Sequence, residues 1–248
     1  CLHARCSLHY LHDSPFDRLA LQVLSGRQAA FGRLCHFETD HMRTVVFVDG
    51  YNLYYGVLRN TKLKWLDLYK LFAQHVLAPD CELLEVRYYT SPVLGRMCDS
   101  AQSPQRQRQY LQVLRHGLTG KVEVIEGKIV PSSPFLRLKQ PIPQAPEVTL
   151  VQVHDFTEKK TDVNLAADLI CGAWEGSFDQ AVLCSNDSDL EAALSSVRRC
   201  LPRVRLGLVA PVPKGDARHL SKDLARQAHW SKTLSLTHIE QSQFPPHI

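Results

Sequence analysis

The chain has 248 residues, of which 44% are hydrophobic and 22% are charged, and its formal net charge is +4. This composition is that of a globular domain long enough to bury a core, and the mild positive charge permits a polyanionic partner without demanding one. No apolar run approaches the roughly 18 residues of a membrane span, and no secretory pattern opens the chain, so we expect a cytoplasmic protein. The eight cysteines include no C-x-x-C pair, which argues against a zinc site or a disulfide framework.

The first 41 residues do not share the pattern of the rest. They contain five of the twelve histidines, and the first methionine is Met42. We expect residues 1–41 to be a non-native or disordered N-terminal extension, with Met42 as the working start. The alternative is a genuine small helical extension. Residues 42–248 then form the domain.

From Met42 onward, predicted strands and helices alternate. The patterns predict strands over 44–48, 83–89, 122–125, 180–184 and 205–209, and helices over 66–76, 105–116, 162–174, 189–197 and 216–227. The tail, 235–248, is predicted to hold a short strand and an irregular end. Such alternation predicts an α/β fold, with a parallel sheet covered by helices on both faces.

A proline-rich excursion interrupts this alternation at residues 130–147. Its prolines exclude a regular helix and a central strand. We therefore predict a departure from the main fold, as an edge hairpin whose return arm is 148–153.

Acidic residues stand where predicted strands end and helices begin. Asp49 follows the strand 44–48, Asp162 begins a helix, and Asp187 and Asp189 follow the strand 180–184. Right-handed crossovers bring the ends of parallel strands to one edge of the sheet, where open α/β folds keep their sites. Asp168 lies about 120° around the helix from Asp162 and ranks lower as a site residue.

Two explanations of these acids stay open. Acids near a helix start interact favourably with the helix dipole, worth about 0.3–1 kcal/mol each. Thr161 and Ser188 have the sequence context of N-caps, the latter in the pattern S-x-x-E. Asp49, by contrast, precedes a predicted turn, where a carboxylate gains little.

The second explanation is a shared cation. Carboxylates about 4 Å apart repel each other by about 4 kcal/mol per pair at an effective dielectric constant of 20. Oxygen ligands without histidine or cysteine favour Mg²⁺ or Mn²⁺ over zinc. Such an ion activates water and neutralises charge on a phosphoryl oxygen, which predicts phosphodiester hydrolysis.

Three segments resemble a known family: VDGYNLYYG ending at Gly56, KKTDVNLAADL at 159–169 and VLCSNDSDLEAAL at 182–194. They are similar to the signature blocks of the NYN domain, the LabA-like branch of the PIN-like nuclease superfamily. The resemblance implies a Rossmann-like, PIN-like fold and Mg²⁺- or Mn²⁺-dependent RNA cleavage. It implies that the catalytic and metal-binding residues are Asp49, Asp162, Asp187 and Asp189, with Asn52 and Ser185 as polar partners. Ser188 and Leu190 depart mildly from the common pattern.

Single-stranded RNA is the expected substrate. Lys159 and Lys160, directly before Asp162, are candidates for contacting its phosphates. Tyr51, Tyr54 and Tyr55 are candidates for stacking on bases, with burial in the core as the alternative for the last two.

The resemblance also leaves two other functions open. The family includes an NADH-dependent hydroxylase of pyridine compounds, an assignment that would require NADH and would admit a flavin as cofactors. No G-x-G-x-x-G follows a strand in this sequence. A non-catalytic RNA-binding module is the third possibility, and the sequence gives no oligomeric state.

Overall fold

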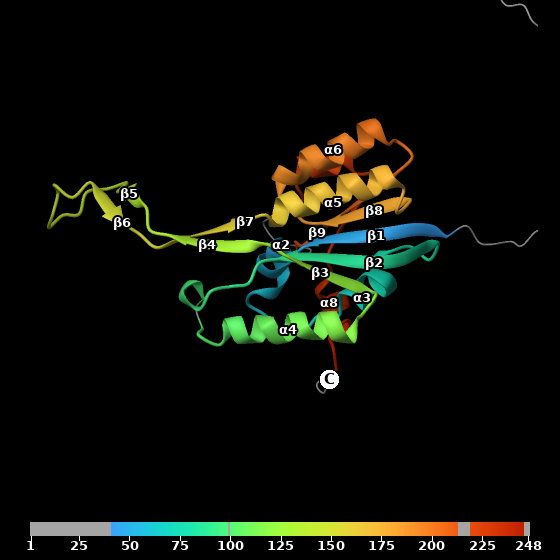
Figure 1. The fold of residues 1–248 in the computed structure, drawn as a ribbon, viewed down its shortest axis with the longest axis horizontal. Coiled ribbons are helices and arrows are strands. Elements are labelled where there is room, and N and C mark those ends of the chain that lie inside the picture. The colour runs from blue at the N-terminus through green and yellow to red at the C-terminus, as the bar shows by residue number, and fades with distance from the viewer. Residues whose placement is uncertain (1–40, 99, 213–218, 246–248) are drawn as a thin grey trace, which may run out of the picture. The chain divides into compact units, whose positions relative to one another are not determined.

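The protein is built around one parallel sheet. The computed structural model describes residues 41–98, 100–212 and 219–245 (Figure 1). Within them the six strands run parallel, in the order β10-β9-β8-β1-β2-β3. Their bounds are β1 (Met42–Asp49), β2 (Cys81–Thr90), β3 (Val122–Glu126), β8 (Gln180–Cys184), β9 (Arg205–Ala210) and β10 (Trp230–Thr233). The predicted α/β fold is confirmed.

Helices cover both faces of the sheet (Figure 1). One face carries α5 (Thr161–Glu175), α6 (Glu191–Cys200) and α7 (Lys222–Gln227). The other carries α3 (Leu68–Leu71) with its π-helical continuation η2 (Phe72–Val76), α4 (Ser103–Gly117) and α8 (Leu236–Gln241). None of the described helices has the length and apolar character that a membrane crossing requires.

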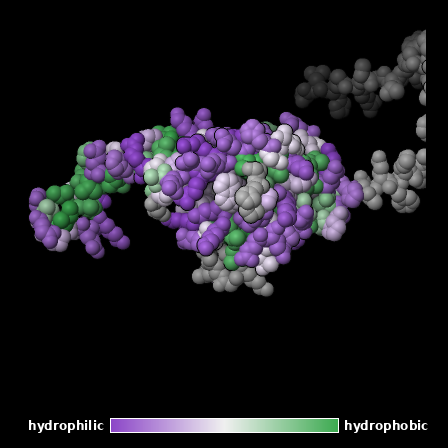
Figure 2. All heavy atoms as spheres, turned by 90° about the horizontal axis from the view of Figure 1, so that it is seen from below, coloured by the Kyte–Doolittle hydropathy of each residue, from purple (hydrophilic) through white to green (hydrophobic). Residues whose placement is uncertain are grey.

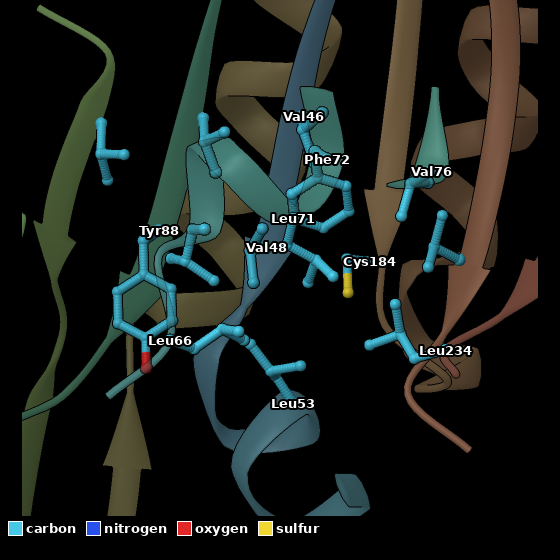
Figure 3. Packing of buried hydrophobic residues seen from close by; sticks show 14 of the residues in the cluster. Val46, Val48, Leu53, Leu66, Leu71, Phe72, Val76, Tyr88, Cys184 and Leu234 are labelled. Carbon is cyan, nitrogen blue, oxygen red and sulfur yellow. The ribbon is translucent and has the colours of Figure 1, made fainter. Parts of the chain in front are cut away.

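Strand β1 lies at the centre of both cores. Its side chains alternate, and Val46 and Val48 pack with Phe72 on one face (Figure 3). Val45 and Phe47 pack against residues of α5 and α6 on the other face. All four side chains are buried. A strand buried on both faces has a continuous apolar sequence, which is why the run before Asp49 predicted it correctly.

The proline-rich excursion forms an arm of two antiparallel strand pairs, separate from the main sheet. Strand β4 (Lys128–Ser132) pairs with β7 (Asp155–Lys159), and β5 (Phe135–Arg137) pairs with β6 (Leu150–Gln152). A hairpin returning near 148–153 was predicted, but it extends no edge of the central sheet. Apolar side chains gather on the arm, where Phe135, Leu136 and Leu150 are exposed (Figure 2).

The C-terminal prediction is wrong in one respect. The last strand is β10, which ends before residue 235, and the tail forms α8 instead of a strand. Ile239 of this helix is fully buried in the core that contains Val46 and Phe72, so tertiary packing decided the helix. A helix was predicted over 216–227. The structure describes this segment only from residue 219 onward, and there the helix α7 begins at Lys222. Residues 1–40, where an extension was predicted, lie outside the described part of the chain.

Close packing at Gly207 of β9 yields a stability prediction. A Cβ atom at this position would overlap the indole ring of Trp230, whose Nε1 donates a hydrogen bond to Gln180 Oε1 at 2.9 Å. Because that bond holds the ring in place, we expect Gly207→Ala to lower the free energy of unfolding by about 1–3 kcal/mol, as overpacked cores do.

The matched control is Gly117→Ala at the exposed end of α4, where the added Cβ would lie 3.9 Å from Val113 Cγ1. That contact is ordinary, so stability should be unchanged or slightly higher. Urea denaturation of both variants measures the difference, and equal losses would contradict the assigned packing.

Candidate active site

The site is built at the carboxyl ends of two neighbouring strands. Asp49 ends β1 and Ser185 directly follows β8, with Val48 paired to Cys184 just before them. The hydroxyl of Ser185 donates a hydrogen bond to Asp49 Oδ2 at 2.9 Å. Asp49 is only 3% exposed, so this serine satisfies one oxygen of a carboxylate that water barely reaches.

Asp49 also begins a helix, contrary to the expectation of a turn. Its Oδ1 accepts the backbone N–H of Asn52 at 2.9 Å, which makes it the N-cap of α2 (Gly50–Leu53). The carboxylate therefore has a structural role in addition to any chemistry. A carboxylate was expected to gain little before a turn at this position, and that expectation was wrong, because the chain after β1 forms a helix that Asp49 caps.

The same serine also positions the segment that contains Asp187 and Asp189. The backbone N–H of Asp187 donates to Ser185 Oγ at 3.0 Å, so one hydroxyl connects Asp49 to the segment after β8. Asp187 Oδ1 then accepts the N–H of Asp189 at 3.1 Å and caps the short 3₁₀ helix η4 (Ser188–Leu190). The predicted N-cap, Ser188, is thus wrong by one position.

Asp162 reaches the site from the first turn of α5. The residue at the N-cap is Lys160, in the left-handed conformation with φ of 80°, and not Thr161 as predicted. The hydroxyl of Thr161 is buried and instead contacts Glu158 and Ser91 Oγ, the latter at 3.1 Å. With Thr161 anchored in this way at the start of the helix, Asp162 lies in the first turn at the edge of the acidic site.

Glu158 is an acid that the sequence interpretation missed. It lies on β7 of the arm and accepts a hydrogen bond from Ser91 Oγ at 2.9 Å. Gly127 allows this close approach, because a Cβ there would overlap both Thr161 Oγ1 and Ser91 Oγ. The sequence around it, DFTEK, gave no signal for this residue, because the alternation of half-buried and exposed side chains along β7 is visible only in the folded structure.

Asn52 braces the two strand ends. Its Oδ1 accepts the N–H of Asn186 at 3.2 Å. Asn186 in turn accepts the N–H of Ser221 at 2.7 Å and donates to the carbonyl of His219 at 3.0 Å. These bonds fix the segment before α7 beside the site.

The remaining candidates lie in different surroundings. Lys159 and Lys160 are exposed at the junction of the arm with α5. Asp168 accepts a hydrogen bond from the hydroxyl of Tyr89 at 2.8 Å, which gives it a partner inside the fold. Its lower rank as a site residue agrees with this contact.

The acids lie close enough for their negative charges to act on Asp162. Partial burial raises the pKa of Asp162 to about 6, and the negative charges of Asp49, Glu158, Asp187 and Asp189 add to the rise. Burial also raises the pKa of Asp49, although the hydrogen bonds from Asn52 and Ser185 oppose that rise. A cation near these groups would lower both pKa values.

The donor chemistry fits a hard divalent cation, since all the converging groups are oxygens. Among the described residues, however, no group of three or more His, Cys, Asp or Glu side chains is already arranged to hold a metal ion. The residues that could hold one are Asp49, Asp162, Asp187 and Asp189, whose charges interact without forming a finished coordination shell.

Because the pKa of Asp162 is raised, we expect Asp162→Asn to increase the free energy of unfolding of the metal-free protein by an amount that depends on pH. Between the ordinary pKa of 3.8 and about 6, the folded state retains a proton that the unfolded chain has lost. The wild type therefore loses stability as the pH rises through this window, whereas asparagine does not titrate. We expect a gain on the order of 1 kcal/mol above about pH 6, after allowance for solvent screening.

Urea denaturation in EDTA on the two sides of this window provides the test. The variant and the wild type should differ little at about pH 4 and most at about pH 8. A difference that is the same at both pH values would mean that neither burial nor the neighbouring acids raise the pKa of Asp162.

Comparison with known proteins identifies the family. The model of the NYN domain matches residues 43–231. A curated relative, 6-hydroxy-3-succinoylpyridine 3-monooxygenase HspA of Pseudomonas putida (strain DSM 28022 / S16), is 33% identical over 212 residues, covering 79% of this chain and 67% of the relative. The crystal structure of VPA0982, a protein of unknown function from Vibrio parahaemolyticus RIMD 2210633, aligns with a TM-score of 0.47 and 17% identity, covering 79% of this chain and 94% of that one. The chain belongs to the NYN domain family, and through it to the PIN-like superfamily.

Proposed function

We propose that this protein is a metal-dependent ribonuclease that hydrolyses phosphodiester bonds of single-stranded RNA. The observation that carries the proposal is the gathering of acids around Asp162 at the carboxyl edge of the sheet, where burial first, and then the charges of Asp49, Glu158, Asp187 and Asp189, raise the pKa of Asp162 to about 6. Such crowding costs stability, and perturbed acids in one place are typical of functional sites. Membership of the NYN family, which suggests a nuclease-type activity, supports the same reaction class.

In this proposal Asp49, Asp162, Asp187 and Asp189 would hold Mg²⁺ or Mn²⁺. When bound, the ion supplies an activated water and neutralises charge on the phosphate. Ser185 fixes Asp49 by the hydrogen bond to its Oδ2.

The other polar residues orient the site and the substrate. Asn52 holds the strand ends together through its bond to Asn186. Lys159 and Lys160 are exposed next to Asp162 and would contact the RNA backbone.

Substitution of the acids tests this proposal directly. With full-length protein, single-stranded RNA and Mg²⁺ or Mn²⁺, we expect Asp49→Asn and Asp187→Asn each to reduce the cleavage rate by about 100-fold or more. Substitution of residues that only hydrogen-bond to metal ligands usually lowers activity or metal affinity about 10–100-fold, and loss of a ligand should cost at least as much. EDTA should abolish cleavage.

The matched control is Glu175→Gln, which neutralises an exposed acid at the far end of α5. It should cleave as the wild type does. Cleavage that persists in the Asp49→Asn/Asp187→Asn double variant would come from a contaminant and would end the nuclease proposal. RNA retention without cleavage in the wild type would instead favour a non-catalytic RNA-binding module.

The named relative favours a second candidate function. That protein is called a monooxygenase of a hydroxypyridine, and this chain is 33% identical to it. The candidate activity is NADH-dependent hydroxylation of an aromatic nitrogen heterocycle, with NADH and in some cases flavin as cofactors. It shares no step with phosphodiester hydrolysis, so the two functions separate in one set of assays.

The nuclease proposal predicts no NADH oxidation when 6-hydroxy-3-succinoylpyridine is added to the purified protein. Absorbance at the NADH band measures this, and a flavin spectrum is recorded on the same sample. Heterocycle-dependent NADH consumption, with stoichiometric hydroxylated product, would establish the second candidate in place of the first.

A further inference from the structure

A small pocket opens directly beside the acidic site. Its volume is about 250 Å³, slightly below the roughly 300–1,000 Å³ of sites for drug-sized ligands. A single ring system suits this volume better than an extended molecule. The lining residues are Tyr51, Asn52, Tyr55, Gly56, Asn186, Pro211 and Val212.

An aromatic wall forms one side of this pocket. Helix α2 widens into a π-helical turn, η1 (Tyr54–Leu58), in which the N–H of Arg59 donates to the carbonyl of Tyr54 at 2.8 Å. The rings of Tyr51 and Tyr55 stack with centroids 6.1 Å apart and planes 11° apart. Tyr55 is nonetheless 50% exposed. Single π-helical turns are frequent at functional sites.

A cation accompanies the exposed ring. The guanidinium of Arg59 lies 5.2 Å from the centroid of Tyr55. This arrangement puts a positive charge next to the aromatic wall, and a cation beside an aromatic face is attracted to its electrons.

The opposite wall depends on the missing side chain of Gly56. A Cβ atom there would overlap the carbonyl oxygen of Pro211, so only glycine lets the two backbones approach this closely. Pro211 and Val212 are buried and follow β9. The pocket therefore lies between the helix after β1 and the segment after β9.

Two asparagines connect the pocket to the acids. Asn52 lines the pocket, and its backbone N–H is the group that caps Asp49. Asn186 lines the same pocket and precedes Asp187 in the chain. A ring seated here would thus lie against Asn52, three residues after Asp49, and Asn186, the residue before Asp187, with their amide groups near its edge.

We propose that this pocket binds a planar heteroaromatic ring, stacked on Tyr55 with its polar edge toward Asn52 and Asn186. That the ring would lie beside the reacting bond rests on the proposed function. The ring has two sources that share this chemistry. One is a nucleobase of the RNA substrate, and the other is the free hydroxypyridine of the second candidate function.

Binding measurements separate these sources. The full chain carries Asp187→Asn to block cleavage, and two fluorescent single-stranded RNAs of about ten nucleotides are titrated with Mg²⁺ present, one intact and one with abasic sites. Calorimetry with 6-hydroxy-3-succinoylpyridine provides the third arm. Each ligand is tested against the unsubstituted pocket, Tyr55→Ala, Tyr55→Phe and the control Trp174→Ala.

Tyr55→Ala should weaken binding of the intact RNA about tenfold, within the range of base–aromatic stacking, and should hardly affect the abasic RNA. Tyr55→Phe retains the ring and should retain most of the affinity. Trp174→Ala removes an exposed aromatic ring at the far end of α5, away from the pocket lining, and should change affinity less than about twofold. Dependence on Tyr55 only for the hydroxypyridine would assign the pocket to the free heterocycle.

The inference is overturned if Tyr55→Ala affects neither ligand, or if Trp174→Ala has an equal effect. Circular dichroism of each variant controls for loss of the fold. These assays measure binding and not cleavage. If the wild type cleaves RNA but Tyr55→Ala leaves binding unchanged, the ring-binding pocket is rejected and the nuclease proposal stands. Ring binding that depends on Tyr55, in a protein that never cleaves RNA, would reject the nuclease alone.

Discussion

The hydrogen bond from Ser185 to Asp49 holds the carboxyl edge of the sheet together. It joins the ends of two strands separated by most of the domain sequence, and it depends on the parallel register of β1 with β8. Asp49 is buried, and a buried carboxylate without partners is costly. By accepting from Ser185 and Asn52, it becomes a fixed point from which the helix after β1 and the segment after β8 both begin.

The arm completes the site from another direction. Strand β7 carries Glu158 against Ser91 at the end of β2, and the chain then turns through Lys160 into α5. The positive φ of Lys160 is unusual for a residue with a side chain. The tight contacts around Gly127 hold this turn, so the junction between arm and helix determines where Asp162 lies.

Stability and function make opposite demands at this edge. Burial, together with the charges of several nearby acids, raises the pKa of Asp162 to about 6, although an exposed and separate carboxylate would cost less free energy. The tyrosine-lined pocket beside them exposes half of a large aromatic side chain that a core would bury. Conflicts of this kind concentrate at functional sites, where the rest of the fold compensates.

The sequence by itself determined the sheet and the location of the acids. A continuous apolar run predicts a strand buried on both faces, and parallel crossovers carry strand ends to one edge, so Asp49 and Asp187 could be placed without coordinates. Only the tertiary structure decided the rest. Glu158 reaches the site through a hairpin whose pairing is non-local, and the caps at Lys160 and Asp187 depend on backbone angles that their neighbours impose. The pocket wall at Pro211 meets Gly56 across the fold, a contact that no local pattern encodes, because it arises from packing between segments distant in sequence.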